Sequence, residues 1–443
     1  MLKRILVNIG LFLMCTLVCA QDDFNLPNNK DYTKINFKLI NNLIVFPVEV
    51  NGVELSFLLD SGVSKPILFN IINLTDSLLV NNVERIYLRG LGADGEIEAL
   101  RSRENFLKVG DAININQDIY VVFDNSINFT PRLGVDVHGI IGYDIFKDFV
   151  VEINYRSKFI KLFKHSESKY KNCRKCESFD MILNKNKPYI DAYAEIDTIK
   201  TPVKLLIDTG SSDALWLFED HEKQILPPNE KYFHDFLGKG LSGNIHGKRS
   251  RVNSFSLGDF HLENVNVAYP DSASISHARK FEERNGSISG DLLKRFNIVV
   301  DYKNLKVTLK KNSNFRKPFF YNKSGIVLEQ YGVRVIKELG EKKYIDNYGR
   351  ENRDNIIVDF SQTFHYSLKP SYTIVELREG SPAERAGLEI GDVILSINNK
   401  GTHKMTLQEA TLYFCEEDKK LIKLEVERKG IIKTFTFRLE SLL

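Results

Sequence analysis

Short apolar runs separated by turn residues dominate the first three quarters of the chain. The runs Val48–Val50, Leu55–Leu59 and Ile67–Phe69 are too short for helices and have the length of β-strands. Similar runs return at Val203–Ile207 and Leu215–Phe218. This pattern predicts a mostly β structure for the region.

Two segments interrupt the strand pattern with a helical spacing of apolar residues. Gly142–Phe149 and Gly290–Phe296 each place apolar side chains three and four residues apart, which predicts one short helix in each. The apolar runs Val150–Tyr155 and Ile298–Tyr302 then predict a strand after each helix.

The chain repeats itself at an offset of 148 residues. Leu-Leu-Asp60-Ser-Gly-Val-Ser recurs as Leu-Ile-Asp208-Thr-Gly-Ser-Ser. Of the eight glycines from Gly62 to Gly142, six have a glycine at the same offset, where chance would give about 0.5. Because a glycine at a fixed place usually serves a turn or a close backbone approach, the two copies should share one fold. We place them at 35–165 and 179–312, with a polar connection at 166–178.

A third domain is predicted at 319–443, where the repeat no longer holds. Ile374–Leu388 and Gly391–Asn398 have the pattern of a strand, a turn, a short helix at Pro382–Ala386 and a second strand. The remaining predicted elements are one helix and two strands, in the order Leu407–Cys415, Leu421–Arg428 and Ile431–Leu439.

The first twenty residues have the pattern of an export signal. Lys3 and Arg4 precede the largely apolar run Ile5–Val18, and polar residues follow Ala20. A membrane anchor is the alternative, but it needs about 20 apolar residues, and no other run is long enough to span a bilayer. We therefore expect a cleaved signal peptide at 1–20, a mature chain without a membrane span, and a periplasmic or extracellular location.

Composition and cysteine spacing narrow the chemistry. Hydrophobic residues make up 43% and charged residues 27%, which excludes a disordered chain, and the net charge of +3 gives no reason to expect a nucleic-acid partner. Cys173-Arg-Lys-Cys176 has no second pair to complete a zinc site, so we expect a local disulfide or two unreactive thiols. The histidines show no metal-binding spacing either, so neither a metal nor another cofactor is expected.

The doubled Asp-Ser/Thr-Gly motif at the end of an apolar strand resembles the aspartic peptidases. It is similar to their retropepsin-like branch with both halves fused in one chain, over roughly Phe37–Lys311. The resemblance implies two β-barrel lobes, a monomer, polypeptide substrates, and Asp60 and Asp208 as the catalytic pair. Two carboxyl groups about 3 Å apart share one proton, so that one activates water while the other polarises the peptide carbonyl.

The same resemblance assigns roles to the residues that follow each aspartate. Ser61 and Thr209 would link the two loops through their hydroxyl groups, and Gly62 and Gly210 would let backbone amides approach the carboxylates. A non-catalytic peptide-binding protein that retains the fold is the alternative function. Degenerate relatives of that kind commonly lose one aspartate, and this chain has both.

One asymmetry separates the two motifs. Ser211 follows Asp208 at the position that Val63 occupies after Asp60. A hydroxyl at this place can donate to the carboxylate and favour its charged form. We therefore expect Asp60 to hold the shared proton more often.

Glycine-rich segments fall where the retropepsin-like family has its flaps, the hairpins that open for a polypeptide and close over it. Both halves carry such a segment, and simple hairpin turns are the alternative interpretation. The flap glycines are Gly90, Gly92, Gly95, Gly238, Gly240 and Gly243.

The third domain resembles a PDZ domain in Ile374–Leu388 and Gly391–Asn398. The full prediction is thus a mostly β chain with two retropepsin-like lobes followed by an α+β PDZ domain. The resemblance implies that Ser324, Gly325 and Ile326 form the loop that binds a C-terminal peptide. An insertion near 329–372 is longer than usual for this domain, and the alternative is that it blocks the binding site.

Overall fold

The chain divides into two compact units. The first comprises 1–129, 136–320 and 442–443, and the second combines Thr130–Val135 with Tyr321–Ser441. The computed structural model describes residues 23–71, 78–124, 127–167, 173–228, 231–339 and 364–443. The predicted signal peptide lies outside the described residues. Among those residues, no helix is long and apolar enough to cross a membrane.

The first half of the repeat forms an eight-stranded sheet in the order β2-β3-β4-β9-β5-β8-β7-β6. Parallel pairing of β4 with β9 sets Leu58 opposite Ile140. Because β4 ends at Leu59, Asp60 leaves the sheet from its middle. The strands are β2 (Lys38–Ile40), β3 (Leu43–Val50), β4 (Val53–Leu59), β5 (Ile67–Leu68), β6 (Glu84–Leu88), β7 (Ile97–Val109), β8 (Ala112–Val121) and β9 (Gly139–Ile141).

The second half forms a sheet of the same size whose order, β13-β14-β15-β20-β16-β19-β18-β17, matches the first strand for strand. Here β15 pairs in parallel with β20 and ends at Ile207, so that Asp208 takes the place of Asp60. The strands are β13 (Ile182–Asn184), β14 (Lys187–Ile196), β15 (Ile199–Ile207), β16 (Leu215–Leu217), β17 (Tyr232–Gly240), β18 (Gly243–Leu257), β19 (Phe260–Pro270) and β20 (Arg284–Ile288). The mostly β duplicated fold predicted from the sequence is therefore confirmed.

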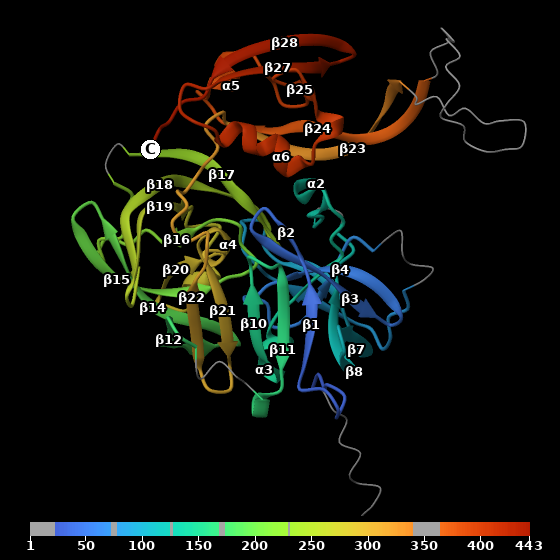
Figure 1. Cartoon of the computed structure of the whole chain (residues 1–443), viewed down its shortest axis with the longest axis vertical. Helices are drawn as coiled ribbons and strands as arrows, with labels where there is room; N and C mark the ends of the chain where they lie inside the picture. The colour runs from blue at the N-terminus through green and yellow to red at the C-terminus, as the bar shows by residue number, and fades with distance from the viewer. Residues whose placement is uncertain (1–22, 72–77, 125–126, 168–172, 229–230, 340–363) are drawn as a thin grey trace, which may run out of the picture. The chain divides into compact units, whose positions relative to one another are not determined.

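A six-stranded sheet joins the two halves, in the order β1-β11-β10-β21-β22-β12 (Figure 1). Its central pair is antiparallel and sets Ile153 of β10 opposite Ile298 of β21. Both side chains are buried in one apolar core that continues through both halves. The strands are β1 (Tyr32–Asn36), β10 (Val150–Asn154), β11 (Phe159–Phe163), β12 (Cys176–Asp180), β21 (Phe296–Asp301) and β22 (Lys306–Lys311).

Helices are few and short among the described residues of this unit. The two predicted helices are present as α3 (Tyr143–Asp148) and α4 (Gly290–Leu293), each directly before a strand of the shared sheet. Ile145 and Phe146 of α3 and Leu292 of α4 are buried in the core, as their spacing predicts. In the described part of the unit, the 3₁₀ turns are η2 (His165–Glu167) and η4 (Ala278–Lys280).

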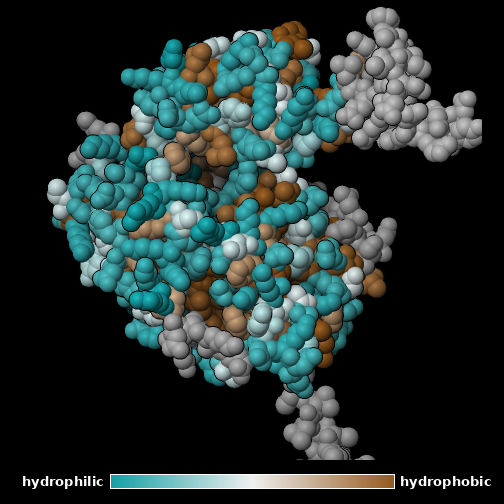
Figure 2. Space-filling model, viewed as in Figure 1, coloured by the Kyte–Doolittle hydropathy of each residue, from teal (hydrophilic) through white to brown (hydrophobic). Residues whose placement is uncertain are grey.

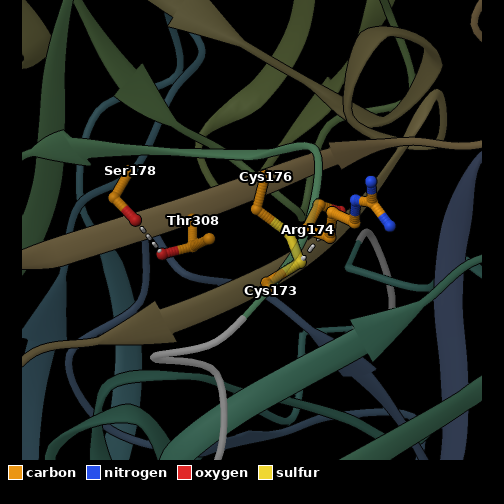
Figure 3. Close-up of a disulfide and its surroundings, with 5 residues drawn as sticks. All are labelled: Cys173, Arg174, Cys176, Ser178 and Thr308. Carbon is orange, nitrogen blue, oxygen red and sulfur yellow. Dashed lines mark hydrogen bonds between the residues drawn. A yellow bond between two sulfur atoms is a disulfide. The ribbon is translucent and has the colours of Figure 1, made fainter.

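The two cysteines of the connection are joined by a disulfide at the beginning of β12 (Figure 3). Their Cα atoms are 5.5 Å apart, within the usual range for such a bond. Beside it, the hydroxyl groups of Ser178 and Thr308 lie 2.7 Å apart across β12 and β22. The disulfide alternative for Cys173 and Cys176 is therefore the one the structure adopts.

The second unit contains a sheet in the order β23-β24-β25-β27-β28, with β26 paired to β25. The described ends of the predicted insertion belong to the long antiparallel strands β23 and β24, and residues 340–363 lie outside the described part. The elements are α2 (Thr130–Leu133), β23 (Ile326–Leu339), β24 (Phe364–Leu377), α5 (Pro382–Arg385), β25 (Val393–Ile397), β26 (Lys400–Gly401), η5 (Thr402–Lys404), α6 (Leu407–Leu412), η6 (Tyr413–Cys415), β27 (Leu421–Arg428) and β28 (Ile431–Arg438).

Local sequence explains the helices of this unit. Ser381 caps α5 by accepting from the amide of Glu384, and Pro382 occupies the first helical position. Thr406 and Glu409 cap α6 reciprocally, each side chain bonding the other's backbone amide. Hydrophilic side chains cover most of the face seen in Figure 2.

Candidate active site

The two predicted catalytic aspartates begin equivalent loops. The amide of Asp60 donates to the carbonyl of Ile141 at 2.9 Å. The amide of Asp208 donates to the carbonyl of Ile288 at the same distance. These bonds continue the parallel pairs β4–β9 and β15–β20 by one residue. The apolar segment about 80 residues after each aspartate therefore fixes the start of its loop.

The loop glycines bind the carboxylates as the resemblance implies. The amide of Gly62 donates to Asp60 Oδ1 at 2.7 Å, and the amide of Gly210 donates to Asp208 Oδ1 at 3.0 Å. A Cβ atom added to Gly210 would lie 2.3 Å from the carboxyl carbon of Asp60. The Asp60 carboxyl group therefore lies against the loop of Asp208, and only glycine leaves room for it.

Ser61 and Thr209 hold the two loops together. The amide of each donates to the hydroxyl oxygen of the other, at 3.0 Å to Thr209 Oγ1 and 3.1 Å to Ser61 Oγ. Each hydroxyl in turn donates to a carbonyl of the opposite half, Ser61 to Ile207 at 2.5 Å and Thr209 to Leu59 at 2.8 Å. Both side chains are buried, so these bonds form away from water.

The environment of the two carboxyl groups favours their protonated forms. Burial, followed by repulsion from Asp208, raises the pKa of Asp60 to about 7 from 3.8. Burial also raises the pKa of Asp208, but the positive charge of Arg284 is the largest effect that opposes it. The arrangement suits one shared proton that resides mainly on Asp60.

Two cations that the sequence reasoning missed act on the aspartates, and Arg284 acts mainly on Asp208. Arg284, at the start of β20, is buried, and its Nε donates to the carbonyl of Gly286 at 3.1 Å. Lys187, at the start of β14, lowers the pKa of both aspartates through its charge, and its own pKa is lowered by burial. Lys187 follows a two-residue hairpin turn at the place that Leu43 holds in the first half. The two hairpins lie 144 rather than 148 residues apart, so only a direct comparison of them would have identified Lys187 from the sequence.

Ser211 acts differently from the expectation. Its backbone amide, and not its hydroxyl, is the group that lowers the pKa of Asp208, and its contribution is smaller than that of Arg284. The predicted direction of the asymmetry agrees with the raised pKa of Asp60, but its causes are the charge of Arg284 and, to a smaller extent, the backbone amide of Ser211.

Both glycine-rich segments are hairpin ends, and they meet each other. The amide of Ser242 donates to the carbonyl of Leu91 at 2.9 Å, and the amide of Asp94 donates to the carbonyl of Ser242 at 2.9 Å. The Ser242 hydroxyl accepts from the amide of Gly90 at 3.0 Å and donates to the carbonyl of Gly95 at 2.6 Å. Ser242, which the sequence reasoning did not single out, therefore joins the two predicted flaps.

Several flap glycines are required by this contact. Gly92 has φ +122°, and a Cβ atom there would lie 1.9 Å from the carbonyl oxygen of Ser242. A Cβ atom on Gly240 would lie 2.1 Å from the carbonyl oxygen of Leu91. Gly95, Gly238 and Gly243 also have positive φ. Leu91 packs against an apolar cluster of the second half that includes Trp216.

The predicted peptide-binding loop of the third domain is bonded to itself. The amides of Ser324 and Gly325 donate to Asn322 Oδ1 at 2.9 and 3.2 Å, and the amide of Ile326 donates to Ser324 Oγ at 3.0 Å. Gly325 has φ +85°, and a Cβ atom there would lie 2.3 Å from the Cβ atom of Ser381. The three amides proposed to hold a terminal carboxylate therefore have acceptors within the loop.

Metal ligation was not expected at this site. Among the described residues, no three histidine, cysteine or acidic side chains gather in a way that could hold a metal ion.

Comparison with known proteins agrees with this geometry. No curated protein matches the chain. The family model described as aspartyl protease matches residues 46–145 and again 193–290, and the model described as PDZ domain matches residues 373–428. The two aspartyl protease matches contain Asp60 and Asp208 in turn. The chain therefore contains two regions of the aspartyl protease family, in its retropepsin-like form, followed by a PDZ domain.

Proposed function

We propose that this protein is an aspartic endopeptidase that uses the Asp60/Asp208 pair to hydrolyse peptide bonds. The observation that carries the proposal is the reciprocal bonding of Ser61 and Thr209, which brings two carboxylate loops together with near two-fold symmetry. A protein that only bound peptides would have no need for two carboxyl groups in an environment that makes their ionisation costly.

The electrostatics assign unequal roles to the two aspartates. Ionised Asp208, favoured by Arg284 and Lys187, accepts a proton from the attacking water. Protonated Asp60 donates a hydrogen bond to the carbonyl oxygen of the substrate, on which negative charge develops. Collapse of the tetrahedral intermediate breaks the C–N bond, and the proton taken up by Asp208 passes to the leaving amine.

The flaps would exclude water and hold the substrate. The contact at Ser242 closes both hairpins on each other, so a polypeptide needs this contact to open before it can enter. Closure over the substrate then returns the site to low polarity, which strengthens the interactions of the carboxyl groups.

The decisive experiment compares the mature chain, 21–443, with its Asp60→Asn and Asp208→Asn variants on a diverse peptide library read by mass spectrometry. Each substitution preserves shape but removes the shared proton, so we expect cleavage to fall by about 10²–10⁴-fold. Asp191→Asn, a change at an exposed aspartate, serves as the matched control and should cleave normally. Equal activity in all four proteins would refute the proposal and would favour peptide binding without catalysis as the function.

Export of the mature protein is a further part of the proposal. It rests on the charged and apolar pattern of residues 1–20. Cell fractionation with N-terminal sequencing should find the protein outside the cytoplasm with Gln21 at or near its first residue. An intact Met1 in a cytoplasmic fraction would contradict it.

A further inference from the structure

The PDZ domain contains a short segment from within the first repeat. Its compact unit combines Tyr321–Ser441 with Thr130–Val135. That segment forms one helical turn, α2, closed by a 2.8 Å hydrogen bond from the amide of Gly134 to the carbonyl of Thr130. Gly134 has φ +65°, which is a common way to end a helix.

This segment lies against both elements that flank the peptide-binding side of a PDZ domain. Arg132 Nε and Glu329 Oε1 of β23 are 2.7 Å apart, and each side chain is 19% exposed. A Cβ atom on Gly134 would lie 3.0 Å from the Cβ atom of Leu407 in α6 and 3.7 Å from Gln330 Oε1 in β23. The turn therefore contacts β23 and α6 together, a place that we call the β23/α6 site.

The β23/α6 site is suited to an internal segment of the chain as its ligand. Within the described residues β23 is the edge strand of its sheet, so its outer side is available to a ligand. The amides of Ser324, Gly325 and Ile326 already have acceptors in the loop, so a bound carboxylate would have to displace Asn322 and Ser324. An internal segment, which has no carboxylate, requires no such displacement.

We propose that the β23/α6 site binds the chain's own segment Thr130–Val135 as an internal ligand, and that an outside peptide binds there only by displacing it. The inference rests on the peptide binding that the match to a PDZ domain suggests, and it is independent of the proposed catalysis by the aspartates. The ligand class is a turn-forming internal sequence with a basic residue that pairs with Glu329 and a glycine that fits beside Leu407.

Peptide binding to the full mature chain tests this directly. The probe is a labelled peptide with the sequence of residues 128–135, Asn-Phe-Thr-Pro-Arg-Leu-Gly-Val, blocked at both ends and followed by fluorescence anisotropy. An Asp60→Asn background prevents its cleavage. We expect at least tenfold weaker binding to the chain with an intact segment than to chains carrying Arg132→Glu or Gly134→Ala, because these changes release the segment and leave β23 and α6 unaltered.

The chain offers a matched control for the glycine variant. Gly380 has the same φ of +65°, but an added Cβ atom would meet nothing within 4 Å. Gly380→Ala therefore introduces the same backbone strain without the clash, and it should bind the probe as weakly as the parent chain. Equal binding by the parent and both segment variants, or no binding by any of them, would overturn the proposal.

A second comparison tests the ligand class. The same peptide with a free C-terminal carboxylate should bind the Arg132→Glu chain within about threefold of the blocked form. A tenfold preference for the free carboxylate would show that the loop binds chain ends and would reject an internal ligand. Neither measurement depends on peptide cleavage, so failure of this inference is distinguishable from failure of the peptidase proposal.

Discussion

Ser61 and Thr209 lie 148 residues apart in sequence, yet each backbone amide donates to the other's hydroxyl oxygen, at 3.0 and 3.1 Å. The bonds connect the two halves at the point where the carboxyl groups meet. With the bonds from the two hydroxyl groups to the carbonyls of Ile207 and Leu59, four hydrogen bonds support both the stability of the protein and the proposed catalysis.

Ser61→Ala should destabilise the protein by about 1–3 kcal/mol, because it leaves the buried amide of Thr209 without its acceptor. Thr209→Ser keeps the hydroxyl and serves as the conservative comparison, with a smaller loss. Urea unfolding gives the free energies, and peptide cleavage by the folded variants gives the effect on catalysis. Equal stability of Ser61→Ala and the parent would show that the hydroxyl bonds do not hold the halves together.

The flap contact makes a prediction about closure. Gly92→Ala should reduce kcat/KM at least tenfold, because its Cβ atom would meet the carbonyl oxygen of Ser242. Gly95→Ala is the control, since Gly95 also has positive φ but an added Cβ atom would meet nothing within 4 Å. Both variants carry about 1–2 kcal/mol of backbone strain. Equal kinetic loss in the two would mean that strain, and not the flap contact, is responsible.

The pH dependence of cleavage should report the cation beside Asp208. Removing Arg284 as Arg284→Met raises the pKa of Asp208, so the acid limb of the pH–rate profile should move to higher pH by about one unit. Arg279, like Arg284, lies over the ring of Phe218 but is not among the charges that shift the two pKa values, so Arg279→Met should leave the limb in place. Ser211→Ala should also leave it in place, because the backbone amide remains. If Ser211→Ala moves the acid limb and Arg284→Met does not, the Ser211 hydroxyl, and not the charge of Arg284, favours the ionised form of Asp208.

Stability should depend on pH through Asp60. Its pKa rises on folding from 3.8 to about 7, so the folded state binds more protons between these values and loses stability as the pH rises through them. Asp60→Asn cannot ionise and should therefore be the more stable protein at pH 7.5, by on the order of 2 kcal/mol, with a much smaller difference at pH 4. Thermal unfolding at both pH values measures this, and Asp191→Asn should show no such pH-dependent gain.

The sequence predicted those parts of the site that the duplication repeats. Asp60 and Asp208 were singled out because the same motif follows the same apolar strand in both halves, and the flap glycines because they recur at the same offset. Arg284 and Ser242 were missed for the opposite reason. Their partners lie on other strands or in the other half, and nothing in the local sequence marks such a pairing.

In the third domain too, local sequence predicted some features while long-range contacts were missed. Its two helices were predicted at Pro382–Ala386 and Leu407–Cys415 from local sequence, and the structure shows that Ser381 and Thr406 cap them. The place of Thr130–Val135 was not predicted, because a six-residue segment carries no pattern that names a partner almost 200 residues away. Long-range side-chain pairing of this kind, as between Arg132 and Glu329, is settled only by the tertiary structure.

The shared six-stranded sheet has a consequence for synthesis of the chain. β10 is completed at Asn154, but the strand that covers its open edge, β21, ends only at Asp301. Until then a nascent first half presents an apolar, unpaired strand edge, the feature through which partly made proteins adhere to one another. Two incomplete chains could pair β10 with β10 in place of β21. The interval between synthesis of β10 and synthesis of β21 is therefore the time when the chain most needs protection from association with its own copies.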